Sequence, residues 1–490
     1  GGEAHGRYPD DDGFPQQPLP GVLVRGVAGY RREGTVTDRE TVLLPNTRRE
    51  VWGWAMYDWA NSAFVTTVAT VLMGPYLTAL AQGAAGENGT ILALGPLGTV
   101  TAKSLYPQAV SLSTFLQLFL LPVLGGVADY TSRKKHLMAG FCAVGSVATV
   151  GMYWVEGDRY LLGAALFVVA NLCLGGSIVL YNAFLNEITT PDRRDAVSSQ
   201  GFALGYLGGG ILLACNLALI TVAPALGMSK GTAVRLSLAS AGLWWGGWSV
   251  VTFRLVRSRP MSRTPVPGLP WLAAGLSEIG AAFRRLRRLP QTARYLVAYT
   301  FYNDGIQTVI AMSSVFLAQE LFTPAQREAG DDVAFLTALI LMVQFVAFFG
   351  AAGFAFAARG FGTKSAVMAS LVIWCAIVVY AYGFLDTTAQ ALAMGAAIGV
   401  VLGGSQALSR SLFSRVIPTG QEATFFGLYE ISERGTSWIG PQVFAVVLAT
   451  TGSYRDAILS LIVLFGIGTV LLWTADVARA EREARALTAQ

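Results

Sequence analysis

The sequence is poor in charge and in histidine. Only 13% of its 490 residues are charged, about half of the 25% that is usual in soluble domains. Its two histidines, His5 and His136, form no Ser-His-Asp set, and no cluster of metal-ligating residues accompanies them. The four cysteines all fall in apolar runs and are typical of small buried side chains. Glycine-rich stretches lack a Walker-type lysine. We therefore expect no enzyme activity, no cofactor and no metal.

The sequence does contain many long hydrophobic runs. Hydrophobic residues make up 53% of the chain, and the mean hydropathy is +0.51. Apolar runs of about 20 residues, each long enough to cross about 30 Å of hydrocarbon, recur along the chain. These runs are continuous rather than alternating, which argues against a β-barrel. The twelve expected spans are 53–80, 104–127, 136–156, 160–186, 197–223, 232–256, 294–320, 332–358, 365–385, 388–414, 424–450 and 454–476.

The spans divide into two groups of six. We predict an all-α membrane protein in which two six-helix bundles are pseudo-repeats. The expected parts are a disordered cytoplasmic tail at 1–50, bundles at 51–256 and 294–476, a basic cytoplasmic linker at 257–293 and a cytoplasmic tail at 477–490. One side of the membrane would hold 28 of the 35 basic residues, so both termini should be cytoplasmic.

The linker carries four closely spaced arginines. They lie in the stretch "GLPWLAAGLSEIGAAFRRLRRL", and they are Arg284, Arg285, Arg287 and Arg288. This pattern is typical of an amphipathic helix lying on an anionic leaflet. We favour that interpretation over nucleic-acid binding, because nothing else in this apolar chain calls for a nucleic acid.

The loop between the second and third expected spans carries a motif. Residues 125–135 read "GGVADYTSRKK", with Asp129 and Arg133 at fixed spacing. This loop resembles the signature of the major facilitator superfamily, in which it is a conformational latch. The corresponding loop in the second half, "ARGFGTK", has Ala358 in place of the acid, so the latch is degenerate there. The alternative interpretation is an ordinary positively charged cytoplasmic loop.

Three further segments narrow the resemblance. They are "GWAMYDWANSAF" at 53–64, "YNAFLNEI" with "GFALGYLGGG" at 181–210, and "GGSQALSRSLFS" with "FFGLYEISERGTSWIGP" at 403–441. Together they resemble the autophagy-linked vacuolar amino-acid effluxers and their bacterial relatives over roughly 51–476. The resemblance implies gradient-dependent export of amino acids from a degradative vacuole to the cytosol, as part of amino-acid recycling after autophagy.

Polar residues inside the first and seventh expected spans are candidates for the transport path. Asp58 and Asn61 share one helix face, and Asn303 and Asp304 hold the matching depth in the seventh span. We expect these four residues to face one another across a water-filled path that binds an amino acid or carries a proton. Alternatively, Asp58 lies close enough to the cytoplasmic end to cap or latch helices.

A second charged group lies in the tenth and eleventh spans. Glu430 and Arg434 are four residues apart and can form an intrahelical pair. Glu433 then needs another partner, for which we predict Arg410. Gln406 and Arg410 share one face of the tenth span. Arg410 could act as a structural gate or could bind a substrate carboxylate bidentately.

These expectations combine into a functional hypothesis. We expect a monomeric secondary transporter of a neutral amino acid, driven by protons with Asp58, Asp304 or Glu430 as carriers, and located in a vacuole membrane if the source is eukaryotic. Two alternatives remain open. One is export of another small organic solute, and the other is a non-transporting membrane receptor with the same fold.

Overall fold

The computed structural model describes residues 45–86, 89–93, 99–131, 133–258, 280–329, 331–434 and 438–488. The disordered tail expected at 1–50 lies almost wholly outside these residues. So does most of the amphipathic helix expected in the linker, of which 280–289 are described and 280–286 are helical.

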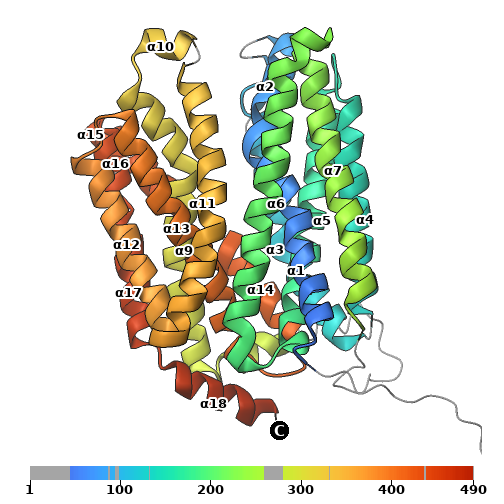
Figure 1. The fold of residues 1–490 in the computed structure, drawn as a ribbon, viewed down its shortest axis with the longest axis vertical. Coiled ribbons are helices and arrows are strands. Elements are labelled where there is room, and N and C mark those ends of the chain that lie inside the picture. Colours follow the sequence, from blue (N-terminus) through green and yellow to red (C-terminus); the bar gives the residue numbers. More distant parts are fainter. Residues whose placement is uncertain are drawn as a thin grey trace, which may run out of the picture. The chain divides into compact units, whose positions relative to one another are not determined.

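Helices α1 to α7 form the N-terminal bundle (Figure 1). A continuous first helix comprises α1 (Arg48–Ala63), the π-helix η1 (Phe64–Leu72) and α2 (Met73–Ala85). The rest of the bundle consists of α3 (Leu105–Tyr130), α4 (Lys134–Gly151), η3 (Met152–Trp154), α5 (Tyr160–Ile188), η4 (Pro191–Arg193), α6 (Arg194–Val222), η5 (Ala223–Leu226) and α7 (Lys230–Leu255). Within it, α1 packs against both α6 and α7, and α4 against α5 and α7.

Helices α9 to α17 form the C-terminal bundle (Figure 1). They are α9 (Pro290–Leu321), α10 (Pro324–Ala329), α11 (Asp331–Phe361), α12 (Thr363–Gly383), α13 (Thr388–Arg415), α14 (Glu422–Arg434), α15 (Ile439–Thr451), α16 (Tyr454–Ser460) and α17 (Ile462–Thr474). The chain continues into α18 (Val477–Thr488), so the segment expected as a plain tail is helical over most of its length. The bundles meet where α14 packs on α3 and α5, and where α11 and α13 pack on α6.

Every expected span falls on a helix or on consecutive helices. Among the described residues, nine helices are long and apolar enough to cross a membrane. The expected spans 232–256, 294–320 and 424–450 do not fall on these nine helices, and the count of twelve stays a prediction. One element was not expected: β1 (Thr90–Ala93) and β2 (Thr99–Thr101) form a small antiparallel hairpin in which Thr90 lies opposite Thr101.

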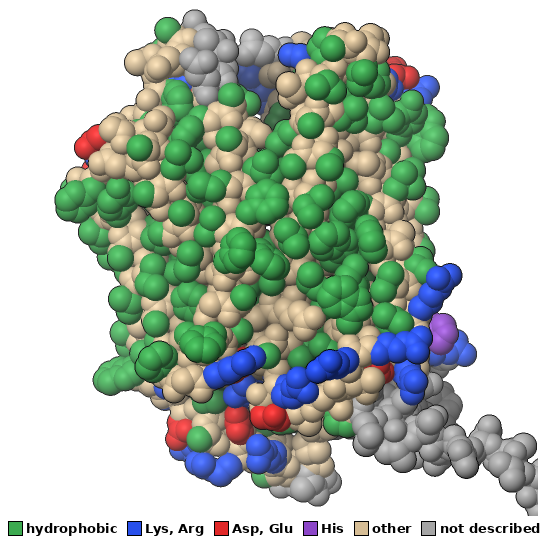
Figure 2. Space-filling model, in the orientation of Figure 1, with side chains coloured by type: hydrophobic (Ala, Val, Ile, Leu, Met, Phe, Trp, Pro, Cys, Tyr) green, Lys and Arg blue, Asp and Glu red, His purple; other side chains and the backbone are tan. Residues whose placement is uncertain are grey.

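The outer surface of the bundles is apolar, and its basic side chains gather at one end (Figure 2). Large side chains such as Val147, Phe349 and Phe356 are 71%, 69% and 78% exposed. Water would not tolerate so much apolar surface, whereas lipid does. We call this end the basic end. Helix α1 begins there, α7 and α13 end there, and α18 lies there.

Helix α4 approaches its neighbours closely through Gly145. A Cβ atom at this position would lie 2.4 Å from the ring of Trp245 and 2.9 Å from Cβ of Cys173. Trp245 is fully buried, and its Nε1 donates to the hydroxyl of Tyr57 at 3.4 Å. A side chain at 145 would therefore push the indole away from the centre of the bundle.

We predict that Gly145→Ala destabilises the protein by about 1–3 kcal/mol, the usual cost of overpacking a core. Gly140→Ala, on the same helix, is the matched control, because a Cβ there meets nothing within 4 Å. Thermal unfolding in detergent should show a lower Tm for the first variant only. Equal Tm values for the two variants would contradict this view of the α4 packing.

Candidate functional site

A buried ion pair joins the two bundles. Oδ2 of Asp58 in α1 lies 3.3 Å from Nη1 and 3.3 Å from Nη2 of Arg410 in α13. The Arg410 side chain is 4% exposed and that of Asp58 is 13% exposed. Asp58 lies ten residues into α1, about 15 Å along the helix from the basic end. The pair therefore crosses the interface well inside α1 and five residues before the end of α13 at Arg415.

The remaining donors of Arg410 are also used. Its Nε donates to Oγ of Ser198 at 2.9 Å, and Nη2 donates to the Ser198 carbonyl at 2.8 Å. Nη1 donates to Oδ1 of Asn182 at 3.3 Å. The guanidinium also lies over the ring of Phe202, with 4.2 Å between its Cζ atom and the ring centroid, a geometry that favours cation–π attraction. Nearly all of the contacts that hold this cation come from the opposite bundle.

Asp58 has a second strong partner in Tyr181. The Tyr181 hydroxyl donates to Oδ2 of Asp58 at 2.7 Å, and the Tyr181 ring stacks on Trp54 with centroids 4.4 Å apart. Gly201 leaves room for this arrangement, since a Cβ there would lie 2.5 Å from Oδ2 of Asp58 and 3.0 Å from Nη2 of Arg410. The carboxylate is thus held by one cation and one hydroxyl in a site that has no space for a larger residue at 201.

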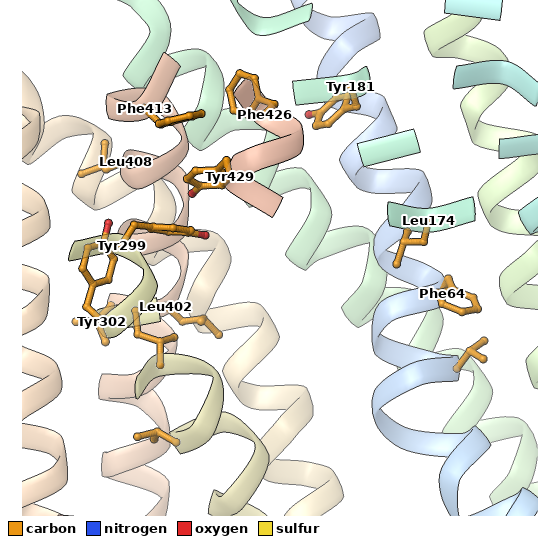
Figure 3. Packing of buried hydrophobic residues seen from close by; sticks show 14 of the residues in the cluster. Phe64, Leu174, Tyr181, Tyr299, Tyr302, Leu402, Leu408, Phe413, Phe426 and Tyr429 are labelled. Atoms are coloured by element: carbon orange, nitrogen blue, oxygen red, sulfur yellow. The ribbon is translucent and has the colours of Figure 1, made fainter. Parts of the chain in front are cut away.

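The network extends to α14 through Asn182. Its Nδ2 donates to Oε1 of Glu430 at 3.1 Å. Glu430 belongs to the same helix as Tyr429, whose ring stacks on Tyr299 at 4.2 Å and on Phe413 at 4.9 Å between centroids. Figure 3 shows these aromatic side chains converging from α9, α13 and α14. Polar contacts and ring stacking therefore meet at the same interface.

A further group of contacts closes the basic end around Asp195. Its carboxylate accepts from Ser411 at 2.6 Å and from Thr363 at 2.6 Å, and it lies 2.7 Å from Nη2 of Arg415. Arg194 donates to the Ser414 carbonyl at 2.8 Å. Sequence reasoning missed Asp195, although its place beside two arginines in the loop "TTPDRRD" was a usable signal.

The structure places the loop residue Asp129 at a helix N-terminus. Its two carboxylate oxygens accept from the backbone N–H groups of Ala423 at 3.0 Å and Thr424 at 2.7 Å, in the first turn of α14. Anions are favoured there by the free N–H groups and the helix dipole. Lys134 lies 3.7 Å from Asp129 and 2.6 Å from Glu187. The other predicted latch residue, Arg133, is exposed at the N-cap of α4.

Asp304 lies at the N-terminus of α15, within the eleventh expected span. That span was predicted as one helix over 424–450; α14 is described as far as Arg434, residues 435–437 lie outside the described part, and α15 begins at Ile439 with Trp438 as its N-cap. Oδ2 of Asp304 accepts from the Gly440 N–H at 2.6 Å, so the carboxylate caps α15. The residue is 1% exposed, and within the described part of the chain its Oδ1 has no hydrogen-bond partner. A carboxylate at a helix N-terminus is favoured by the free N–H groups and the helix dipole.

One expectation about partners is corrected by this geometry. Arg410 pairs with Asp58, whereas Glu433 accepts from the Tyr299 hydroxyl at 2.9 Å. The cause is that helical periodicity identifies the buried face of a helix but not the helix that will lie against it. The water-filled path expected between Asp58, Asn61, Asn303 and Asp304 stays a prediction.

The remaining predicted site residues are distributed along the interface. Gln406 accepts from the Tyr206 hydroxyl of α6 at 2.5 Å, which adds a contact between the bundles. Asn61 and Asn303 are buried, and in the described residues the Nδ2 of each lacks a partner. The side chain of Arg434 lies outside the described part, and with it the predicted Glu430–Arg434 pair.

Comparisons with known proteins agree with this architecture. The profile of a family described as "Vacuole effluxer Atg22 like" matches residues 46–193 and 186–485. YxiO of Bacillus subtilis, described as an uncharacterized MFS-type transporter, is 31% identical over 425 residues, which are 86% of this chain and 93% of YxiO. Autophagy-related protein 22-1 of Penicillium rubens is 24% identical over 565 residues, with 91% of this chain and 93% of that protein covered.

Solved structures of similar fold are transporters. The major facilitator superfamily transporter FucP in its outward conformation gives a TM-score of 0.63 at 12% identity, covering 88% of this chain and 99% of FucP. A bacterial homologue of the iron transporter ferroportin in an outward-facing state gives a TM-score of 0.60 at 13% identity, with 87% and 98% covered. At these identities the likeness concerns the fold.

We predict that Asp58→Asn loosens the interface at the basic end. Loss of one partner from a buried ion pair costs about 3–5 kcal/mol, because Arg410 is left without its counter-charge. Ser414, which is 1% exposed, can be replaced by cysteine in a background without native cysteines. Its labelling by a membrane-impermeant maleimide should then become at least about tenfold faster in the Asp58→Asn variant.

The matched control for that experiment is Asp158→Asn. Asp158 is exposed in the turn between η3 and α5, far from the ion pair along the helices. Labelling should stay at the wild-type rate in this control. If Asp58→Asn were also labelled at the wild-type rate, the ion pair would not hold the interface closed.

A pH dependence is expected from Glu422, which precedes the expected span at 424–450. Burial raises its pKa to about 7, with Lys134 opposing and Asp129 adding to the shift. An unfolded glutamate titrates near pH 4.3, so between about pH 4.3 and 7 the folded state holds this proton more firmly. The stabilisation is complete below that window and is lost as the pH rises through it. Glu422→Gln should reduce the fall in Tm between about pH 5 and 7.5, and an unchanged slope would contradict the assignment.

Proposed function

The chain belongs to the Atg22-like family of vacuole effluxers within the major facilitator superfamily, and from this premise we propose that it exports amino acids by alternating access. It is an integral multi-pass transporter and not an enzyme. We further propose that the basic end faces the cytosol, as the positive-inside rule favours, and that amino acids leave a vacuole-type compartment toward that side.

The observation that carries the proposal is the Asp58–Arg410 ion pair. It joins the two bundles, and the contacts of Asp195 and Asp129 lie beyond it toward the basic end. In this conformation the basic end is closed. Opening it requires that Arg410 leave both Asp58 and Ser198, so the pair has the place and the composition of a gate.

The charges of the gate support an amino acid as the substrate. Separating a buried cation from a buried anion is costly unless each finds a new partner. A zwitterion supplies both, since its carboxylate can accept from Arg410 while its ammonium binds Asp58. A neutral amino acid would thereby compensate both groups without adding net charge. A monovalent anion or a sugar would leave at least one of them uncompensated.

A proton is the proposed coupling ion. Protonation of Asp58 would remove one charge of the gate and weaken its hold on Arg410. Asp304 is the second proposed carrier, because it is buried and caps the half-helix α15. Movement of a proton on or off this carboxylate would change its interaction with the helix terminus. Glu430, in contact with Asn182, is placed to link the two sites through α14.

Counterflow in proteoliposomes tests the proposal. The wild-type chain should exchange internal neutral amino acid for labelled amino acid outside, and a pH gradient should accelerate net flux. Asp58→Asn and Arg410→Lys should abolish flux at unchanged expression, and Asp304→Asn should abolish the response to the pH gradient. Glu156→Gln, in an exposed pair with Arg235 at the opposite end, should transport normally.

The outcomes separate the proposal from its alternatives. Flux of another small organic solute, with no amino-acid exchange, would show that the substrate is that solute and not an amino acid. Measurable binding without flux would identify a receptor of the same fold. Full activity of Asp58→Asn would remove the gate from the mechanism.

A further inference from the structure

A groove runs along the outer face of α7. Its volume is about 590 Å³, and its walls are mainly apolar side chains of α7 with one residue of α6. Leu243 is 66% exposed and Trp248 is 39% exposed at this groove. Gly247 forms part of the groove, and a Cβ atom there would meet nothing within 4 Å. The groove is therefore open space beside α7.

Tryptophans give one wall of the groove a fixed shape. Trp244 and Trp248 line it, with centroids 5.8 Å apart, and both pack on Trp59 of α1 at 5.4 and 5.9 Å. Nε1 of Trp244 donates to the Trp59 carbonyl at 3.2 Å. This three-ring cluster holds the wall in one conformation before anything binds. A ligand in the groove would therefore not lose free energy by ordering these side chains.

A positively charged side chain lies at the end of the groove nearest the basic end, which we call the mouth of the groove. Arg254 lines the groove one residue before the end of α7, at the basic end, and it is exposed. Among the described residues its guanidinium has no hydrogen-bond or ion-pair partner. Arg257 follows it, also exposed, and its backbone N–H donates to Glu50 at 3.1 Å. The mouth is therefore positively charged where the groove reaches the expected head-group level.

The dimensions of the groove match those of one lipid chain. Fourteen residues of α7 separate Arg254 from Ser240 at the far end, which is about 21 Å along the helix. A leaflet contributes about 15 Å of hydrocarbon. The groove thus extends from the membrane surface past the middle of the bilayer, and it runs parallel to the direction in which acyl chains lie.

We propose that this groove binds one anionic glycerophospholipid, with its phosphate at Arg254 and an acyl chain along Trp248 and Leu243. The apolar walls, the preformed ring cluster and the unpaired cation each fit one part of that molecule. A transmembrane segment of another protein would fill the apolar part but would leave Arg254 without an anion. This site lies on the outside of the N-terminal bundle, and the proposal stands whether or not the substrate is an amino acid.

Native mass spectrometry of the full chain in detergent tests the proposal. The purified protein is mixed with equal amounts of phosphatidylglycerol and phosphatidylcholine of the same acyl composition, and the retained lipid is identified by mass. The wild type should retain one phosphatidylglycerol in preference. Arg254→Gln should lower that preference about fivefold, since one basic residue near an anionic head group contributes about 1 kcal/mol.

A second pair of variants tests the groove itself. Gly247→Phe fills the open space and should abolish retention of either lipid. Gly466→Phe on α17 is the matched control, because a Cβ there also meets nothing within 4 Å, and it should retain lipid as the wild type does. The proposal is overturned if Gly247→Phe retains the lipid, if the wild type shows no preference between the head groups, or if a second copy of the chain occupies the groove and Gly247→Phe dissociates it.

Discussion

The interaction on which the rest of the structure depends is the ion pair between Asp58 and Arg410. Two charges removed from water must compensate each other almost completely, and here they do so only while the two bundles touch. Tyr181 donates to Oδ2 of Asp58, and Ser198 accepts from Nε and Nη2 of Arg410. A well-packed apolar pair would often be at least as stable in such a place. What charges add is a contact that can be exchanged for another charged partner, and an alternating-access transporter needs such a contact at its gate.

The eleventh expected span connects this gate to the rest of the C-terminal bundle. Its first half, α14, is held at its N-terminus by Asp129 of the opposite bundle. Its second half, α15, is held at its N-terminus by Asp304 of its own bundle. The same physical device, a carboxylate on free backbone N–H groups, is thus used twice along one span. Helix α14 packs mainly on α3 and α5 of the opposite bundle, whereas α15 packs on α16 and α9 of its own bundle.

Local sequence patterns were sufficient for the helices but not for their partners. The expected span 388–414 ends within one residue of α13 (Thr388–Arg415), because the apolar length and the flanking polar residues are local properties. The partner of Arg410 is not a local property. Glu433 was expected because it follows on the next helix, whereas Asp58 lies 352 residues away.

The π-helix η1 has a consequence for comparing the two halves. Each of its turns takes up about one residue more than an α-helical turn, and it extends over nine residues, Phe64–Leu72. Beyond it, side chains are displaced by about two positions, which rotates them toward the opposite face. Asp58 and Asn61, which are expected at the same depth as Asn303 and Asp304, lie before this segment. Past Leu72, residues at the same count from the start of each repeat no longer point their side chains toward the same face of the helix. A sequence alignment of the two bundles therefore needs a gap there.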